Sequence, residues 1–454
     1  MTPSDFRDLE LRYPLDAWPP PLATAVLSLQ WLVVLLPGLL VLGEVVAAAL
    51  DLDPAGRVAL LQRLMLLGGL VQLAQVWLGH RLPGLVGPAT VLMVGMLATL
   101  GAGQGAVFGA MAIGGGLTAL VGALGLGRRL GRLYTPPVLA ATLLLIAVSL
   151  GPTMRDLLFD PRTRGAGLAG PFLFAMILAG LMFLAQNRLK GLMGSAVLLL
   201  GLALGSLAYH LLGLGADPAP AAAAPAWTVW GPPPLMPGPL ALDWGVLAAF
   251  VLCYLALIAN ELASVEALGA MLGLTDLGRR PDRAVMVSGL GGLVAGLWGL
   301  PGPVTYSLSP GVLISTKSAS RFTLAPAGVA LIGLALWPGG LAWVGLMPAP
   351  VVGAVLFALM ANTVYAALLM LFRDECRPDW SAGLVVGVGV IGGLVVSFMP
   401  AAAREALHPL LRPLLANGFV MGLVLSLAME HLVLRRPRVT PAASAPWPGR
   451  GRNN

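Results

Sequence analysis

Fourteen apolar segments, each close to the length needed to cross a bilayer, follow one another through most of this chain. A helix of about 20 mainly apolar residues spans the hydrocarbon core of a membrane. The segments lie at 23–49, 57–79, 83–101, 104–126, 136–152, 168–187, 191–213, 243–271, 284–300, 303–317, 323–342, 348–372, 381–399 and 412–434. Only 10% of the residues are charged, whereas a soluble domain carries about 25%. The sequence therefore predicts an all-α polytopic membrane protein with about fourteen transmembrane helices.

The basic residues predict which side of the membrane each loop occupies. If both termini are cytoplasmic, twenty of the 27 Lys and Arg residues fall on the cytoplasmic side. Cytoplasmic loops carry such an excess of positive charge, which accounts for the net charge of +7 without a nucleic-acid partner. We therefore expect a multi-pass protein of the bacterial inner membrane, in contact with membrane lipid, with both termini cytoplasmic.

A long loop rich in Pro and Ala divides the fourteen segments into seven and seven. Because seven is odd, a second half of similar fold would be inserted upside down, an arrangement typical of secondary transporters. The predicted organisation is a cytoplasmic N-terminal tail (1–22), a first seven-span repeat (23–213), an extracytoplasmic loop (214–242), a second repeat (243–434) and a cytoplasmic C-terminal tail (435–454).

The third and tenth segments are poor lipid-facing helices. The third begins LPGLVGPAT at Leu82, and the tenth is reached through GLPGPVTYSLSPG at Gly299. Proline removes a backbone donor, and non-helical backbone at membrane depth is tolerated only inside protein or beside a cavity. Interrupted segments at corresponding places in two halves indicate a midplane binding site. We expect short extended stretches in spans 3 and 10.

The run from Gly289 to Arg321 resembles the ninth and tenth spans of the nucleobase–ascorbate transporter family, which includes bacterial uracil and xanthine permeases. The residues that keep the family's spacing are Pro303, Thr305, Tyr306, Gly311, Thr316, Lys317, Ser320 and Arg321. The later MPAPVVGAVLFALM, starting at Met347, is similar to the segment that opens the family's twelfth span. The resemblance extends over most of the chain, from near residue 20 to the twelfth segment.

The resemblance implies a mechanism as well as a fold. A core domain of spans 1–4 and 8–11 would move against a gate domain of spans 5–7 and 12–14, carrying substrate by an elevator-type motion. Family members commonly couple to protons, some couple to sodium, and many are homodimers. No cofactor is implied besides the coupling ion.

Two positions depart from the family pattern. The family's Glu or Gln followed by Asn corresponds here to Leu308 and Ser309, and its first-span Gln-His pair appears as Gln30 and Trp31. The Leu308 side chain cannot hydrogen-bond the edge of a nucleobase. These departures affect the expected substrate more than the expected fold.

Glu261 is the leading candidate for substrate binding and for proton coupling. It lies in an apolar segment, where a carboxylate is costly unless it faces a cavity or a partner. Its two oxygens can accept two N–H bonds from a planar heterocycle. Counting back from Gly273, however, family spacing places Asn260 where the family has its glutamate. Ser264 shares a helix face with Asn260, so the three form one candidate patch.

The other candidate substrate-binding residues lie in the interrupted segments and the first span. Half-helix N-termini there would offer unpaired N–H donors. These candidates are Thr305, Tyr306, Ser307, Leu308, Ser309, Ala89, Thr90 and Gln30, with Gln72 and Gln75 as weaker ones. The four histidines have no metal-like spacing. Neither a nucleotide-binding loop nor a hydrolase motif is present, so we expect no enzyme and no metal site.

The sequence thus favours a secondary active transporter, proton-coupled or else sodium-coupled, of a xanthine-, uracil- or urate-like nucleobase. One alternative is an anion transporter similar to the sulfate permeases, because VTYSLSPGVLISTKSASR is also similar to their tenth span. A second is a membrane receptor or scaffold that does not transport, an interpretation that Leu308 keeps open.

Overall fold

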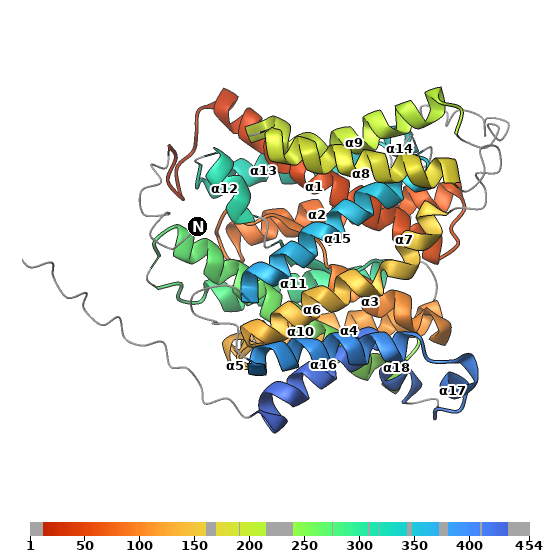
Figure 1. Ribbon diagram of the computed structural model, residues 1–454. Coiled ribbons are helices and arrows are strands. Elements are labelled where there is room, and N and C mark those ends of the chain that lie inside the picture. The colour runs from red at the N-terminus through yellow and green to blue at the C-terminus, as the bar shows by residue number, and fades with distance from the viewer. Residues whose placement is uncertain are drawn as a thin grey trace, which may run out of the picture.

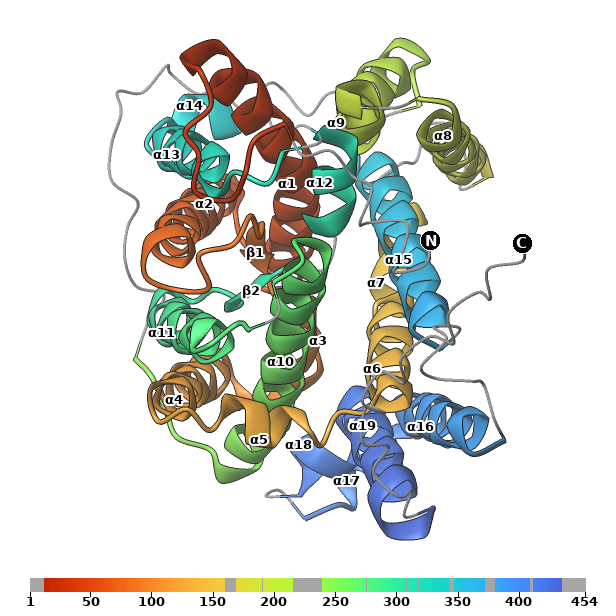
Figure 2. The ribbon, with the colours of Figure 1, turned by 90° about the vertical axis from the view of Figure 1, so that its left-hand side faces the viewer.

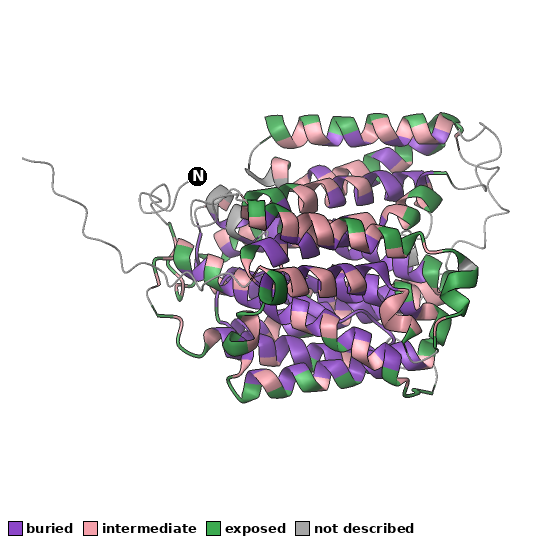
Figure 3. Cartoon of the chain, turned by 60° about the horizontal axis from the view of Figure 1, so that its bottom comes forward, coloured by how far each residue is buried: buried purple, intermediate pink, exposed green. Residues whose placement is uncertain are grey.

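The computed structural model describes most of the chain and is predominantly helical. The described residues are 12–159, 169–189, 191–214, 239–274, 276–306, 309–316, 318–342, 347–371, 380–408 and 411–434. Most of the predicted tails and of the predicted loop 214–242 lies outside these ranges. Figure 1 shows the helices packed into one bundle, and Figure 3 shows buried residues running through its middle.

Helices lie in all the apolar segments that the sequence predicts. The first half contains α1 (Pro21–Ala49), α2 (Pro54–Trp77), β1 (Val86–Pro88), α3 (Thr90–Thr99), the short helix η2 (Leu100–Ala102), α4 (Gln104–Ala123), α5 (Gly127–Gly131), α6 (Pro136–Ser149), α7 (Gly151–Leu158), α8 (Ala169–Arg188) and α9 (Gly191–Leu211).

The second half begins after residue 238. It contains α10 (Trp244–Met271), α11 (Arg280–Trp298), β2 (Pro303–Thr305), α12 (Ser309–Thr316), η3 (Arg321–Thr323), α13 (Leu324–Ala335), α14 (Pro338–Ala342), α15 (Ala349–Leu371), α16 (Trp380–Ser397), α17 (Ala401–Glu405), α18 (Arg412–Leu415), α19 (Gly418–Ala428) and η5 (Met429–Val433).

Among the described residues, eight helices are long and apolar enough to cross a membrane: α1, α2, α4, α6 with α7, α8, α10, α15 and α16. Four shorter apolar helices cover Thr90–Ala102, Ala196–Leu211, Arg321–Ala335 and Gly418–Val433. The protein is therefore a multi-pass membrane protein. The count of fourteen spans stays a prediction, because α11 and α12 belong to neither group.

Local sequence explains where several helices begin and end. Asp53 caps α2 by accepting a hydrogen bond from the Gly56 amide (2.9 Å), and Asp243 caps α10 through the Val246 amide (2.9 Å). Such side chains satisfy amide donors that have no partner within the helix. At the end of α11, Gly299 adopts φ 70°, a left-handed conformation suited to glycine. The chain then turns out of α11 toward β2.

The helices form two groups that lie side by side. The elements α1, α2, α3, α4, α10, α11 and α13 gather around the two short strands, and α6, α8, α9, α15, α16 and α19 form the second group (Figure 2). Between the halves, α4 packs on α11 and α2 packs on α13. Within the halves, α8 packs on α9 and α16 packs on α19. The seven-plus-seven inverted repeat stays a prediction.

Glycines allow α4 and α11 to pack with their backbones in contact. A Cβ atom on Gly115 or Gly122 of α4, or on Gly289 or Gly296 of α11, would overlap backbone atoms of the opposing helix. Small residues are the usual means of close helix packing inside membranes. The α4–α11 pair is therefore a closely packed support for the strand β2, which follows α11 directly.

Candidate functional site

The prediction that the third and tenth segments are broken by extended stretches is confirmed. Strands β1 and β2 pair antiparallel, with Val86 opposite Thr305 and Pro88 opposite Pro303. Two further hydrogen bonds extend the crossing, from the Ala89 amide to the Gly302 carbonyl and from the Tyr306 amide to the Leu85 carbonyl (both 2.7 Å). Buried backbone groups need partners, and neighbouring side chains supply them to the outer edges of this two-stranded sheet.

Gln72 of α2 satisfies the outer edge of β1. Its side-chain amide donates to the Gly84 carbonyl (3.0 Å), and its carbonyl oxygen accepts from the Val86 amide (2.8 Å). Only 1% of Gln72 is exposed. One carboxamide thus replaces two hydrogen bonds that a neighbouring strand would supply.

Glu261 and Ser264 of α10 satisfy the end of β2. The Thr305 amide donates to Glu261 Oε2 (2.9 Å), and the Thr305 hydroxyl donates to Glu261 Oε1 (2.6 Å). The Ser264 hydroxyl donates to the Thr305 carbonyl (3.2 Å). Both side chains are fully buried. The carboxylate therefore holds the strand in place, and it shares this task with Ser264, one turn along α10.

Gln75 connects this carboxylate to α2 and α11. Its side-chain nitrogen lies 3.4 Å from Glu261 Oε1 and donates to Ser288 Oγ and to the Ala284 carbonyl, both at 3.0 Å. Its oxygen accepts from the amide of His80 (3.2 Å). Glu261 is thus one member of a buried polar network that spans three helices.

Ser309 links the two interrupted segments at the start of α12. Its hydroxyl accepts from the Leu85 amide (2.9 Å) and donates to the Tyr306 carbonyl (2.7 Å). The Tyr306 hydroxyl in turn donates to the Pro88 carbonyl (3.2 Å). A Cβ on Gly87 would overlap the Tyr306 ring, so glycine at that position leaves the ring its place beside β1.

The structure brings most of the predicted site residues to this crossing. Ala89 and Thr90 begin α3, and Gln30 lies buried on α1, which contacts β1. Asn260 is half-buried beside Glu261 on α10. The predicted residues Ser307 and Leu308 lie outside the described residues.

The sequence interpretation placed Asn260, Glu261 and Ser264 in one patch, and in the structure Glu261 and Ser264 both bond to Thr305. It missed Ser288 and His80, whose only signal is a polar residue in or beside an apolar segment. No cluster of potential metal ligands occurs among the described residues.

Comparisons with known proteins agree with this architecture. The family model described as Permease family, the xanthine/uracil permease model, matches residues 22–402. The putative purine permease YwdJ of Bacillus subtilis is 24% identical over 90% of this chain and 96% of its own length. The uric acid permease PucK of the same organism is 24% identical over 89% of this chain and 94% of its own length.

A solved structure shares the fold. The transmembrane domain of the cyanobacterial bicarbonate transporter BicA superposes with a TM-score of 0.57 at 14% sequence identity, and the match covers 92% of this chain and 99% of that domain. Such a likeness shows the fold alone. The family match over residues 22–402, together with the strand crossing that it contains, shows that this chain is a permease and not an enzyme, and that it belongs to the xanthine/uracil permease family.

Proposed function

We propose that this permease is a secondary active transporter of a purine-type nucleobase, driven by protons. The family match over residues 22–402 carries the proposal. It is supported by relatives named for purine and uric acid transport. It is also supported by the crossing of β1 and β2, where the N-terminus of α3 offers backbone donors to a polar ligand.

In this proposal Asn260 provides the contact that reads the substrate edge. It is half-buried, and it lies one residue from the fully buried Glu261. A carboxamide both donates and accepts, so it can pair with the alternating donors and acceptors of a purine. The oxygens of Glu261, by contrast, are already bonded to Thr305.

Glu261 is the proposed carrier of the coupling proton. When Glu261 is ionised, the Thr305 hydroxyl donates to it. A hydroxyl can also accept, so a protonated Glu261 can donate to the same oxygen while still accepting from the Thr305 amide. The strand would then stay in place in both protonation states. This exchange of roles lets a buried carboxylate take up and release a proton without opening the crossing.

Transport would proceed by an elevator-type motion. The group of helices around the strands corresponds to the proposed core of spans 1–4 and 8–11, and the other group to the gate of spans 5–7 and 12–14 (Figure 2). We propose that the protein acts as a homodimer in a bacterial inner membrane with both termini cytoplasmic, an orientation that the excess of Arg and Lys on that side supports.

An anion transporter is the second candidate, favoured by the fold likeness to the bicarbonate transporter BicA. The two functions predict different ligands. Thermal unfolding of the purified protein should be measured with xanthine, hypoxanthine, uric acid, uracil, sulfate and bicarbonate, because a ligand that binds the native state raises the melting temperature with concentration. Stabilisation by sulfate or bicarbonate alone would support the anion function and contradict ours.

Variants then separate binding from coupling. We expect Asn260→Ala to lose stabilisation by purines, whereas Glu261→Gln keeps it but loses proton-driven uptake into proteoliposomes. Thr363→Ala is the matched control, because its hydroxyl bonds to the Leu359 carbonyl of its own helix α15, away from the strand crossing. If purines stabilise the protein but the wild type takes up no purine into proteoliposomes under a proton gradient, the non-transporting receptor is supported instead.

A further inference from the structure

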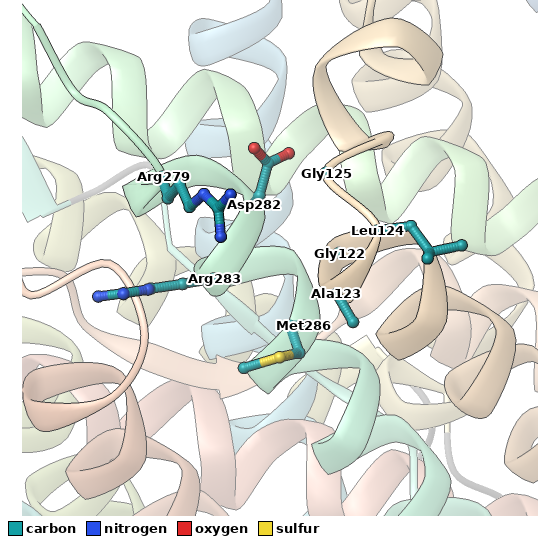
Figure 4. A pocket seen from close by; sticks show the side chains of 8 residues that line it. All are labelled: Gly122, Ala123, Leu124, Gly125, Arg279, Asp282, Arg283 and Met286. Atoms are coloured by element: carbon teal, nitrogen blue, oxygen red, sulfur yellow. The ribbon is translucent and has the colours of Figure 1, made fainter.

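A pocket lies where α4 ends and α11 begins. It encloses about 220 Å³ and is lined by the chain turn at Gly122, Ala123, Leu124 and Gly125 and by Arg279, Asp282, Arg283 and Met286 (Figure 4). Helix α4 is a candidate membrane span that ends at Ala123. The pocket therefore lies at the boundary between the hydrocarbon core and the aqueous side.

The charges around the pocket are mainly positive. Arg279 and Arg283 are both exposed, and Figure 4 shows their side chains at the same pocket as Asp282. Arg128 lies 3.7 Å from Asp282 Oδ2. The loops that carry these arginines are on the predicted cytoplasmic side. Basic pockets between helices at that surface suit the head groups of anionic lipids.

Asp282 adds a second feature. It is only 6% exposed, and its Oδ1 atom has no hydrogen-bond partner within the described part of the chain. A buried carboxylate oxygen without a donor is unfavourable. A head group that carries a hydroxyl beside its phosphate would bring a donor to this carboxylate.

Two rows of exposed apolar side chains lead away from this pocket. On α4, Leu124 (63% exposed) lines the pocket, and Leu120, Leu117 and Ile113 follow it on the same helix face at 54%, 47% and 40% exposed. On α11, Leu290 (48% exposed) lies one turn beyond Met286, and Leu297 (38% exposed) lies two turns further along. A charged head-group pocket with apolar rows beginning at its rim fits a whole lipid molecule, with acyl chains along the helices.

We propose that this pocket binds an anionic phospholipid with a hydroxyl-bearing head group, of the phosphatidylglycerol type. Arg279 and Arg283 bind the phosphate, a head-group hydroxyl donates to Asp282, and the acyl chains lie along the exposed leucines of α4. The lipid would bridge α4 and α11, the helix pair that leads directly into β2.

The test is native mass spectrometry and thermal unfolding of the detergent-solubilised protein titrated with dioleoyl phosphatidylglycerol, dioleoyl phosphatidylcholine or inorganic phosphate. An arginine near an anionic lipid contributes about 1 kcal/mol. We therefore expect the single variant Arg283→Gln to lose about five-fold in phosphatidylglycerol affinity. The double variant that combines Arg279→Gln and Arg283→Gln should lose more. Arg188→Gln removes an exposed arginine at the end of α8, outside the pocket, and should bind like the wild type.

Three outcomes would overturn the proposal. Equal binding of phosphatidylcholine and phosphatidylglycerol would remove the role of the head-group charge. An equal loss in Arg188→Gln would reduce the effect to general surface attraction. Arginine-dependent stabilisation by inorganic phosphate alone would assign the pocket to a soluble phosphate. A separate variant, Ala123→Trp, should fill the pocket and lower phosphatidylglycerol binding while leaving every charge in place.

Discussion

The two interrupted segments perform the same structural task with different chemistry. At β1 a neutral carboxamide, Gln72, satisfies the strand edge from α2. At β2 a carboxylate, Glu261, does so from α10 with the help of Ser264. Of the two side chains that satisfy the strand edges directly, only Glu261 is ionisable. A proton taken up at Glu261 therefore acts on the partner of β2, whereas the partner of β1 has no such group.

The approaches to the two strands also differ. Before β1 the chain carries His80, fully buried, and it turns through Arg81 with φ 56°. Before β2 the turn is at Gly299 with φ 70°, followed by uncharged residues up to the strand. The segment before β1 therefore contains a titratable side chain, His80, and a strained backbone conformation at Arg81. The segment before β2 contains neither.

Exchanging the two side-chain chemistries tests the comparison most severely. Gln72→Glu places a carboxylate against the Gly84 carbonyl, without a charged partner, and should cost about 3 kcal/mol or more. Glu261→Gln retains one acceptor for the Thr305 amide and one donor for its hydroxyl. Because that donor would lie near the Gln75 side-chain nitrogen, 3.4 Å from Glu261 Oε1, the variant should still cost about 1 kcal/mol. Melting temperatures of both variants in detergent check this. Equal losses of stability in the two variants would mean that the charge of Glu261 itself helps to keep β2 in place.

The pH dependence of stability isolates the approach to β1. Burial, with the nearby Arg280 charge as a smaller cause, lowers the pKa of His80 from its ordinary 6.5 to about 3. Below pH 6.5, His80 therefore binds a proton in the unfolded chain but stays neutral in the folded chain. Stability from this residue is complete above pH 6.5 and falls as the pH drops toward 3, by about 2 kcal/mol between pH 6.5 and 5.

A conservative variant shows whether His80 is the cause. His80 Nδ1 accepts from the Leu82 amide (2.9 Å), and an asparagine oxygen can replace that acceptor. His80→Asn should therefore lose less stability than the wild type between pH 6.5 and 5 in thermal unfolding scans. His210→Asn, at an exposed position on α9, serves as the control and should leave the pH profile unchanged. An unaltered profile in His80→Asn would assign the acid sensitivity to other groups.

The sequence predicted the presence of this site better than it predicted which of its side chains bond to one another. Prolines and glycines around Gly87 and Pro303 indicate interrupted helices, because their local effect on the backbone does not depend on distant partners. Glu261 stood out as a carboxylate in an apolar run. Its partner Thr305 is 44 residues away, and Ser288 is 213 residues from Gln75. Pairings over such distances depend on tertiary packing, which helical periodicity alone does not encode.

Two serines sharpen the comparison at a smaller scale. Ser309→Ala removes the acceptor for the buried Leu85 amide and should cost about 2 kcal/mol, because an unpaired buried donor retains its full desolvation penalty. Ser264→Ala removes one donor to the Thr305 carbonyl and should cost about 1 kcal/mol. Apparent melting temperatures of both variants measure the difference. A larger loss in Ser264→Ala would show that the β2 end, not the link between the strands, limits stability.

The smallest expected effects concern the turns that precede the strands. Gly299→Ala forces a side chain into the left-handed region and should cost about 1 kcal/mol. Arg81→Gly relieves the same conformation before β1 and should gain up to about 1 kcal/mol, reduced by the greater freedom of glycine in the unfolded chain. A lower melting temperature in Gly299→Ala and a higher one in Arg81→Gly would show that both turns need the same left-handed backbone conformation, which glycine adopts without strain and arginine does not. If both variants lose stability, the Arg81 side chain, which donates to the Trp77 carbonyl (2.8 Å), matters more to that turn than its backbone conformation.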